Sequence, residues 1–437
     1  MNMKKWLTRG GACLGVAGVC VVAAIASPIV PKPDVSDLIH QLAQEIRDNY
    51  VFPDKGDEAA TMLEQKLDQG EYNGLAGMQL AQKLTNDLQS FTHDRHFGVR
   101  PASPQAEGEH SPQPANVPTA PFGFAKVERL DGNIGYVDLR GFAPRAAAAP
   151  TVHAAMKLLQ GSDALIFDLR QNGGGDPETV QLLCSYLFDP DNPVHLNSLY
   201  FRPTDETTEF WTQPDQLESD AMASTPVWVL TSNYTFSGGE EFTYNLKTRQ
   251  RATIVGETTG GGAHPVDGFM LGDHQLVALI PVGRAINPVT GDDWEGKGVA
   301  PDVEAPASEA LDIAISQALE RMAKSEDPGK AENAAWALAN IQAKRGGKAV
   351  SEDALRELAG AYGDRKFELR DGALWYARSN ATAGGAWRKL ICIADDTFVI
   401  EGIQDFRLEF NRDDDAKVIG VTGHYKVREP DYTKREG

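Results

Sequence analysis

The sequence is poor in cysteine, in positive charge and in long apolar runs. It has four cysteines, and 42 lysines and arginines against 62 aspartates and glutamates give a formal net charge of −20. Such an acidic balance excludes binding to nucleic acid through bulk charge. The sequence has no phosphate-binding GxxxxGK[ST] loop and no Cys/His cluster with metal-ligand spacing. We therefore expect no cofactor and no metal.

The N-terminus departs from this composition. Lys4, Lys5 and Arg9 precede an uncharged apolar run from Gly11 to Ala26 that ends in small residues. This pattern predicts a signal peptide over residues 1–26, cut after Ala26, and hence a periplasmic or secreted protein. A retained anchor is the alternative, but the run is shorter than the roughly 20 residues that span a bilayer, so we expect no stable membrane insertion. Removing three positive charges and no acid moves the net charge from −20 to −23.

Two cysteines, Cys184 and Cys392, remain after that cut. Both stand in apolar contexts, QLLCSY and KLICIAD, and they are far apart in the sequence. Free buried thiols are favoured over a disulfide.

The first part of the mature chain has helical periodicity. A helical N-terminal domain is predicted over residues 34–100, with Ser36 as a helix cap and Leu80, Leu84 and Leu88 on one face. Residues 101–121 are rich in proline, alanine and serine, which predicts a linker.

Residues 122–306 alternate between short apolar strands and helices. The strands are predicted at NIGYVDLRGF, ALIFDLR, VWVLT and ATIVGE, with helices at VHAAMKLLQ and PETVQLLCSYLF. This alternation indicates an α/β domain with a largely buried sheet. Two helices predicted over residues 308–345 look like a spacer. From 350 to 437 the apolar period changes to two, which predicts a small antiparallel β domain.

Ser237 is the candidate nucleophile. It lies between the apolar strand VWVLT and an amphipathic helix, where free backbone N–H groups and the helix dipole stabilise negative charge. Gly238 and Gly239 follow it and let a substrate approach. The alternative is structural, because S-G-G-E from Ser237 to Glu240 is also a capping box.

Three further segments supply what acyl transfer requires. The glycines that end FDLRQNGGG leave backbone N–H groups approachable, as an oxyanion site needs, although for three glycines taken alone a tight strand-to-helix turn is the favoured explanation. THDRHFGVRP offers His93 and His96 as bases. In DDWEGKGVAPDVE, Glu295 beside Trp294 either orients a histidine or solvates a loop.

In this order, FDLRQNGGG, SNYTFSGGEEF, RATIVGETTGGG and EGKGVAPDV resemble the tail-specific or C-terminal processing protease family, in the branch shared with tricorn protease and interphotoreceptor retinoid-binding protein. The resemblance covers roughly residues 40–306. It implies a crotonase- or ClpP-like spiral of β-β-α units with a helical N-terminal domain, and it leaves the C-terminal β domain outside.

The resemblance also implies site residues. It places the nucleophile at Ser237, the base at His96 and the supporting carboxylate at Glu295, with Gly238 and Gly174 or Gly173 as oxyanion donors. Members with a serine–lysine dyad carry lysine where this chain has Gly262, so that dyad is absent. The tricorn branch has a second serine where Arg95 stands, and residues 101–121 are too short for the family's PDZ insertion. His264 is the second candidate for the base.

We therefore predict an exported serine peptidase that cleaves peptide or protein substrates through an acyl-enzyme. Two alternatives stay open: a non-catalytic protein that binds hydrophobic ligands, as the retinoid-binding relatives do, and an esterase or amidase acting on small molecules.

Overall fold

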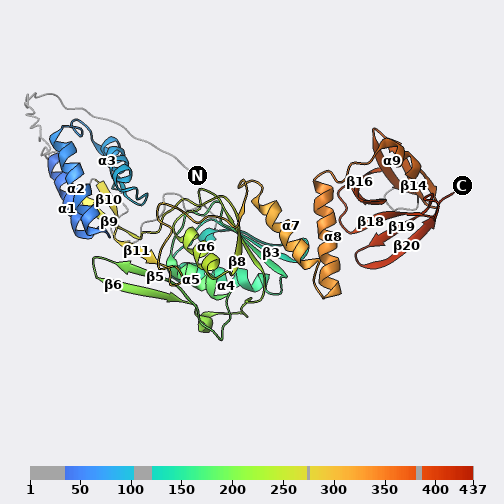
Figure 1. Ribbon diagram of the computed structural model, residues 1–437, viewed down its shortest axis with the longest axis horizontal. Helices are drawn as coiled ribbons and strands as arrows, with labels where there is room; N and C mark the ends of the chain where they lie inside the picture. The colour runs from blue at the N-terminus through green and yellow to red at the C-terminus, as the bar shows by residue number, and fades with distance from the viewer. Residues whose placement is uncertain (1–34, 103–120, 273–275, 380–385, 437) are drawn as a thin grey trace, which may run out of the picture.

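The protein is elongated, with a helical N-terminal region, a central body and a C-terminal domain arranged along the long axis (Figure 1). The computed structural model describes residues 35–102, 121–272, 276–379 and 386–436. Helices α1 to α3 lie at one end, a central α/β body follows, and helices α7 and α8 connect it to a β domain at the other end.

The N-terminal region contains three amphipathic helices: α1 (Val35–Asn49), α2 (Pro53–Asp68) and α3 (Gly77–Thr92). Leu80, Leu84 and Leu88 are buried on one face of α3, as their spacing predicts. The predicted cap at Ser36 is wrong, because α1 already includes Val35 and Ser36 lies in its first turn. Among the described helices, none is both long and apolar enough to cross a bilayer.

A three-stranded antiparallel sheet joins this region to residues much later in the chain. Its order is β1 (Gly98–Pro101), β10 (Leu276–Pro281) and β9 (Val266–Leu271). Leu271 and Ile280 are fully buried against the N-terminal helices, in one cluster with Leu42. The hairpin β9–β10 lies within the range that the sequence assigned to the core, but it packs on the N-terminal helices.

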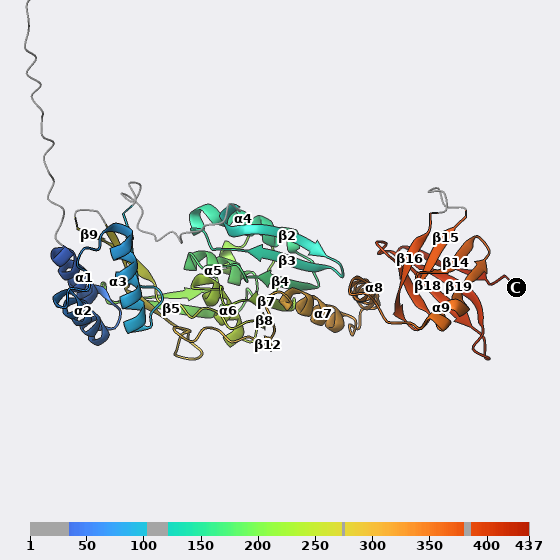
Figure 2. The same cartoon turned by 90° about the horizontal axis from the view of Figure 1, so that it is seen from above.

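The central sheet has six strands in the order β12-β8-β7-β4-β3-β2, so the strands follow the chain order across the sheet (Figure 2). The hairpin of β2 and β3 is antiparallel, and all later neighbours are parallel. The parallel strands are almost continuously apolar because helices cover both faces. The bounds are Phe124–Leu130, Ile134–Leu139, Ala164–Asp168, Val227–Thr231, Ala252–Gly256 and Val303–Glu304 for β2, β3, β4, β7, β8 and β12.

Helices α4 (Arg145–Leu159), α5 (Pro177–Ser185) and α6 (Gly238–Thr248) cover one face of the central sheet. Helices α7 (Ala310–Met322) and α8 (Pro328–Lys344) bury their alanine-rich faces on the other. These two helices, expected as a spacer, thus close the core of the central body. A separate antiparallel sheet flanks it, with β5 (His195–Phe201) between β11 (Gly283–Ile286) and β6 (Glu206–Trp211).

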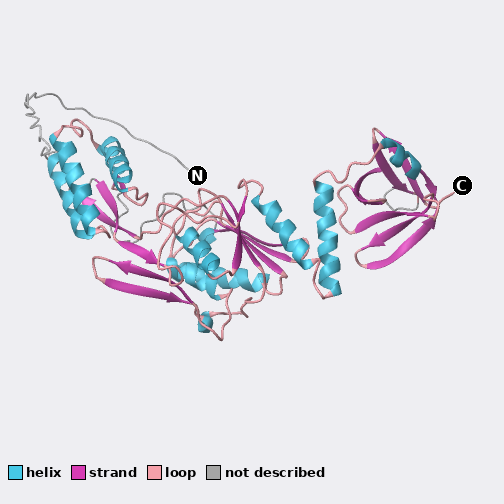
Figure 3. Cartoon of the chain, in the orientation of Figure 1, coloured by secondary structure: helices cyan, strands magenta, loops and turns pink. Residues whose placement is uncertain are grey.

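The C-terminal domain contains the short helix α9 (Glu352–Leu358) and an eight-stranded antiparallel meander (Figure 3). The Glu436 N–H donates to the Ala361 carbonyl at 2.9 Å, so the end of the meander meets its start. Strands β13 to β20 span Gly360–Tyr362, Arg365–Arg370, Ala373–Arg378, Arg388–Ala394, Thr397–Ile400, Phe406–Arg412, Val418–Tyr425 and Arg428–Lys434.

The mixed α/β class, the helical N-terminal region and the antiparallel C-terminal domain are confirmed. Cys184 and Cys392 are buried free thiols, as expected. The predicted signal peptide and most of the predicted linker lie outside the described residues.

Candidate active site

Ser237 follows strand β7 and a five-residue loop, and it caps helix α6. Its backbone has φ 50° and ψ −121°, a conformation that costs a residue with a side chain on the order of 1–3 kcal/mol. Gly174 makes room for it, because a Cβ on Gly174 would stand 2.7 Å from the Ser237 Cβ. Ser237 therefore lies in a strained conformation at the N-terminus of α6, against the glycines of residues 173–175.

Glu240, three residues further on, holds this turn. Its carboxylate accepts from the Ser237 N–H at 2.9 Å, which forms one half of the predicted capping box. It also accepts from the Thr259 hydroxyl and from the N–H groups of Gly261 and Gly262, at 2.5, 2.6 and 2.8 Å. Burial raises the pKa of Glu240, and these donors act in the opposite direction. The capping residue thus also ties Ser237 to the loop at residues 258–262.

Asn172 fixes the glycine loop beside Ser237. Its Oδ1 accepts from the Gly174 N–H at 2.8 Å, and its carbonyl accepts from the Phe236 N–H at 3.0 Å. The Gly174 N–H is therefore already engaged, which counts against it as an oxyanion donor. The Gly173 N–H has no acceptor among the described residues. Of the two glycines offered by the sequence, Gly174 lies closer to Ser237 but has its N–H engaged, whereas the Gly173 N–H is available among the described residues.

His96 reaches the site from the turn between α3 and β1. Its ring packs on Phe236, the neighbour of Ser237, with centroids 4.7 Å apart. A Cβ on Gly262 would lie 2.2 Å from Phe236 and 2.6 Å from the His96 Cε1. No side chain fits at Gly262, so the position that carries lysine in the dyad members is closed here.

Both ring nitrogens of His96 are buried without a hydrogen-bond partner among the described residues. Among the described residues, His96 therefore makes no hydrogen bond to Ser237 and reaches it only through the contact with Phe236. The His96 Nδ1 lies 3.8 Å from the Asp94 Oδ1 and 3.8 Å from the Glu295 Oε2. The same three side chains place possible metal ligands within 4.8 Å of one another.

Glu295 is held by the backbone of the loop that carries Gly262. The Ala263 N–H donates to the Glu295 Oε2 at 2.6 Å, and the Trp294 indole N–H donates to the Gly262 carbonyl at 2.7 Å. The Glu295 Oε1 is buried and unpartnered among the described residues. Its carboxylate thus faces His96 with one oxygen held and one free.

His264 lies on the far side of the same carboxylates. Its Nδ1 is 2.6 Å from the Asp94 Oδ2 and 3.5 Å from the Glu295 Oε2, and its side chain is 3% exposed. Burial lowers the pKa of His264, but the hydrogen bond and charge of Asp94 outweigh it, so the pKa is raised. Burial raises the pKa of Asp94, and the hydrogen bond from His264 outweighs it, so that pKa is lowered. The two groups thus form a buried pair next to His96.

Sequence reasoning did not assign roles to Asp94, Asn172 or the remote bonds of Glu240. The position of Asp94 two residues before His96 was the available signal, because its Oδ1 accepts from the His96 N–H at 3.0 Å. Arg95, the departure from the tricorn branch, donates to the Gly260 carbonyl at 2.7 Å and lies over the Phe236 ring at 5.3 Å. Arg95 therefore helps to hold Gly260 and Phe236 in position at the edge of the site.

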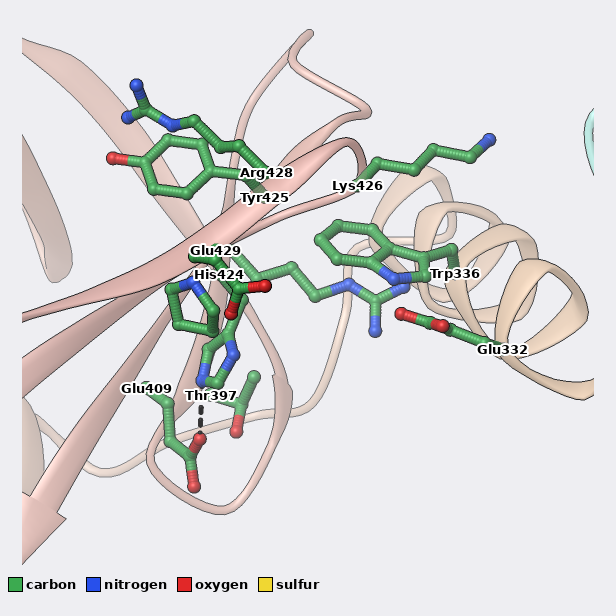
Figure 4. A pocket seen from close by; sticks show the side chains of 11 residues that line it. Glu332, Trp336, Thr397, Glu409, His424, Tyr425, Lys426, Arg428 and Glu429 are labelled. Atoms are coloured by element: carbon green, nitrogen blue, oxygen red, sulfur yellow. Dashed lines mark hydrogen bonds and ion pairs between the residues drawn. The ribbon is translucent and has the colours of Figure 1, made fainter. Parts of the chain in front are cut away.

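A cavity of about 440 Å³ lies elsewhere, between α8 and the C-terminal sheet (Figure 4). His424 is hydrogen-bonded there to Glu409 at 2.7 Å, and Arg428 stacks on Tyr425 at 3.5 Å. Three basic and three acidic residues line it: Arg407, Lys426, Arg428, Glu332, Glu409 and Glu429. This balanced lining selects no ligand charge, and the cavity shares no residue with the site around Ser237.

Two segments of the chain are similar to known protein families. Residues 133–305 match the model of peptidase family S41, and residues 29–129 match the N-terminal domain of peptidase S41 in eukaryotic IRBP. The carboxyl-terminal-processing peptidase 2 of Arabidopsis thaliana chloroplasts is 32% identical over 179 residues, which are 40% of this chain and 32% of that protein. The chain thus matches about a third of that relative's length.

Solved structures give similarities at lower identity. A putative peptidase from Parabacteroides merdae has 17% identity and a TM-score of 0.48, covering 65% of this chain and 96% of its own. Tricorn protease has 15% identity and a TM-score of 0.45, covering 66% and 37%. The chain thus carries a peptidase family S41 domain at residues 133–305, preceded by a segment that matches that family's N-terminal domain.

Proposed function

We propose that the protein is an exported serine peptidase that cleaves peptide bonds in peptide or protein substrates through an acyl-enzyme. One observation carries this proposal: the strained Ser237 at the start of α6 lies against a glycine loop on one side, and on the other it adjoins Phe236, on which His96 packs. Nucleophile, base and oxyanion donors are the groups that acyl transfer needs within one site.

In the proposed mechanism, His96 takes the Ser237 proton as the hydroxyl attacks the scissile carbonyl, and returns it to the leaving amine. Glu295 keeps the imidazole in the required tautomer and stabilises the imidazolium. The N–H groups of Gly238 and Gly173 bind the oxyanion, each contributing about 3–4 kcal/mol as in comparable sites. Water then releases the acyl group by the same route.

Changing Ser237 to alanine tests the nucleophile. Wild-type protein should form a covalent adduct with a fluorophosphonate probe, located at Ser237 by mass spectrometry, and the variant should not. Serine at a second helix N-terminus offers a matched control, so Ser351→Ala should label like wild type. Ser351 caps α9 through its bond to the Ala354 N–H. An adduct on any other residue would refute the assignment.

The substrate class and the export are tested separately. Comparing turnover of peptides and of simple esters by the purified protein distinguishes a peptidase from an esterase. Expression with the full N-terminus, followed by mass determination of the mature protein, should show a chain that begins after Ala26. A mature chain that still carries Met1 would contradict export by cleavage.

A further inference from the structure

We propose that Asp94, His96 and Glu295 form a binding site for a divalent transition-metal ion, with Zn²⁺ as the best match, and that the bound ion switches the peptidase off. Binding of the ion is independent of the proposed catalytic function. Only the inhibition rests on that function.

The distances suit a small ion. The His96 Nδ1 is 3.8 Å from one oxygen of each carboxylate, and all three ligand atoms lie within 4.8 Å. Zinc bonds of about 2.0–2.2 Å in tetrahedral geometry require ligand atoms roughly 3.3–3.5 Å apart. The two distances to His96 therefore need to close by a few tenths of an ångström, and the two carboxylates, within 4.8 Å of each other, by at most about 1.5 Å. Water supplies the fourth position.

One unused ligand atom, the His96 Nδ1, distinguishes this site from an ordinary acidic cluster. The His96 side chain is 10% exposed, and neither of its nitrogens has a partner among the described residues. The Glu295 Oε1 is likewise buried and unpartnered. A neutral imidazole and two carboxylates also balance the two positive charges of the ion. A buried nitrogen without a partner is costly, so an ion that engages the His96 Nδ1 is favoured.

The surroundings hold the ligands in place. His264 contacts the Asp94 Oδ2 at 2.6 Å, which leaves the Oδ1 directed at His96. The Ala263 N–H fixes the Glu295 Oε2 at 2.6 Å. Such outer contacts orient the ligands of metal sites and contribute to affinity. The imidazole ligand and the small ligand number favour Zn²⁺ over Mg²⁺ or Ca²⁺, which prefer more oxygen ligands.

The consequence for catalysis follows from the ring chemistry. An ion on the Nδ1 takes the place of the proton that Glu295 would hold, so the remaining proton of the neutral ring sits on the Nε2. The Nε2 then donates and cannot accept the Ser237 proton. The bound ion therefore prevents His96 from acting as the base without contacting Ser237.

Calorimetric titration of the full-length protein with Zn²⁺ tests the site. Ser237→Ala should bind the ion as tightly as wild type, which makes the measurement independent of catalysis. His96→Gln and Glu295→Gln should each weaken binding at least about 10–100-fold, and His264→Ala about 10-fold through loss of the contact to Asp94. His424→Gln, in the His–Glu pair of the C-terminal cavity, is the matched control and should not change it. Unaltered affinity in His96→Gln and Glu295→Gln would overturn the proposal.

Fluorophosphonate labelling tests the inhibition. Saturating Zn²⁺ should block labelling of wild-type protein and a chelator should restore it. Labelling that persists at saturation would overturn the inhibition. If Ser237 is never labelled while Zn²⁺ binding still depends on His96, the metal site stands and the proposed peptidase mechanism fails.

Discussion

Two buried clusters of charged side chains lie in different parts of the molecule and differ in how completely they are hydrogen-bonded. In the C-terminal domain, the fully buried Arg365 is paired with Asp431 and donates to the Thr433 hydroxyl at 2.8 Å, and only its Nε lacks a partner. Arg378 extends the network to Asp364 at 2.7 Å. Around His96, by contrast, four buried atoms of His96, His264 and Glu295 are unpartnered among the described residues.

The difference indicates two uses of buried charge. A satisfied network fixes one packing arrangement and serves stability, whereas unpaired polar atoms carry a cost that the rest of the fold must offset. The cluster with unpartnered buried polar atoms, and hence with a cost in folding free energy, is the one beside Ser237. Three changes test this distinction.

The largest expected effect is on catalysis. His96→Gln should lower kcat/KM by about 10⁴-fold or more, because the glutamine amide cannot accept the serine proton. The melting temperature should change by no more than about 2 °C, since the replaced nitrogens make no hydrogen bonds that the structure describes. Steady-state kinetics and calorimetry measure the two quantities. A large stability loss with modest kinetic change would reverse the interpretation of this cluster.

In the C-terminal domain we expect a loss of stability without a loss of peptide turnover. Asp431→Asn leaves the buried Arg365 guanidinium without its charge partner and should cost about 2–3 kcal/mol in the unfolding free energy of that domain, less than for a fully buried pair because Asp431 is 38% exposed. Urea unfolding measures the cost. Peptide turnover below the unfolding transition should stay at the wild-type value, and a loss of turnover there would show that the two clusters are coupled.

The smallest expected effect is on the pH dependence of stability, and it concerns Glu241, the neighbour of Glu240 on α6. Burial raises the pKa of Glu241 to about 8, although Asn197 and Asn245 act in the opposite direction. The folded protein therefore keeps a proton that the unfolded chain releases near pH 4.5, so stability falls as the pH rises from about 4.5 to 8. Glu241→Gln should remove this part of the slope and raise the melting temperature at pH 8 by a few degrees. Parallel pH profiles for both proteins would argue against the raised pKa.

The sequence predicted the parts of the site that depend on neighbours in the chain. The strand, turn and helix around Ser237 follow from local patterns, and so does the contact from Glu240 back to the Ser237 N–H. Contacts between distant segments could not be predicted in this way. The contact of Asp94 with His264 spans 170 residues and depends on the pairing of β1 with β10. The engagement of the Gly174 N–H by Asn172 depends on side-chain direction, which glycine spacing does not encode.

The hairpin β9–β10 also has a consequence for the order of folding. It pairs with β1 and packs on the N-terminal helices, although about 165 residues of chain separate them. Contacts of such long range form late, because the intervening loop must close first. The side chain of Glu295 follows later still in synthesis. A growing chain therefore carries Ser237 before His96 and Glu295 are assembled near it, so the proposed site forms only after most of the protein has been made.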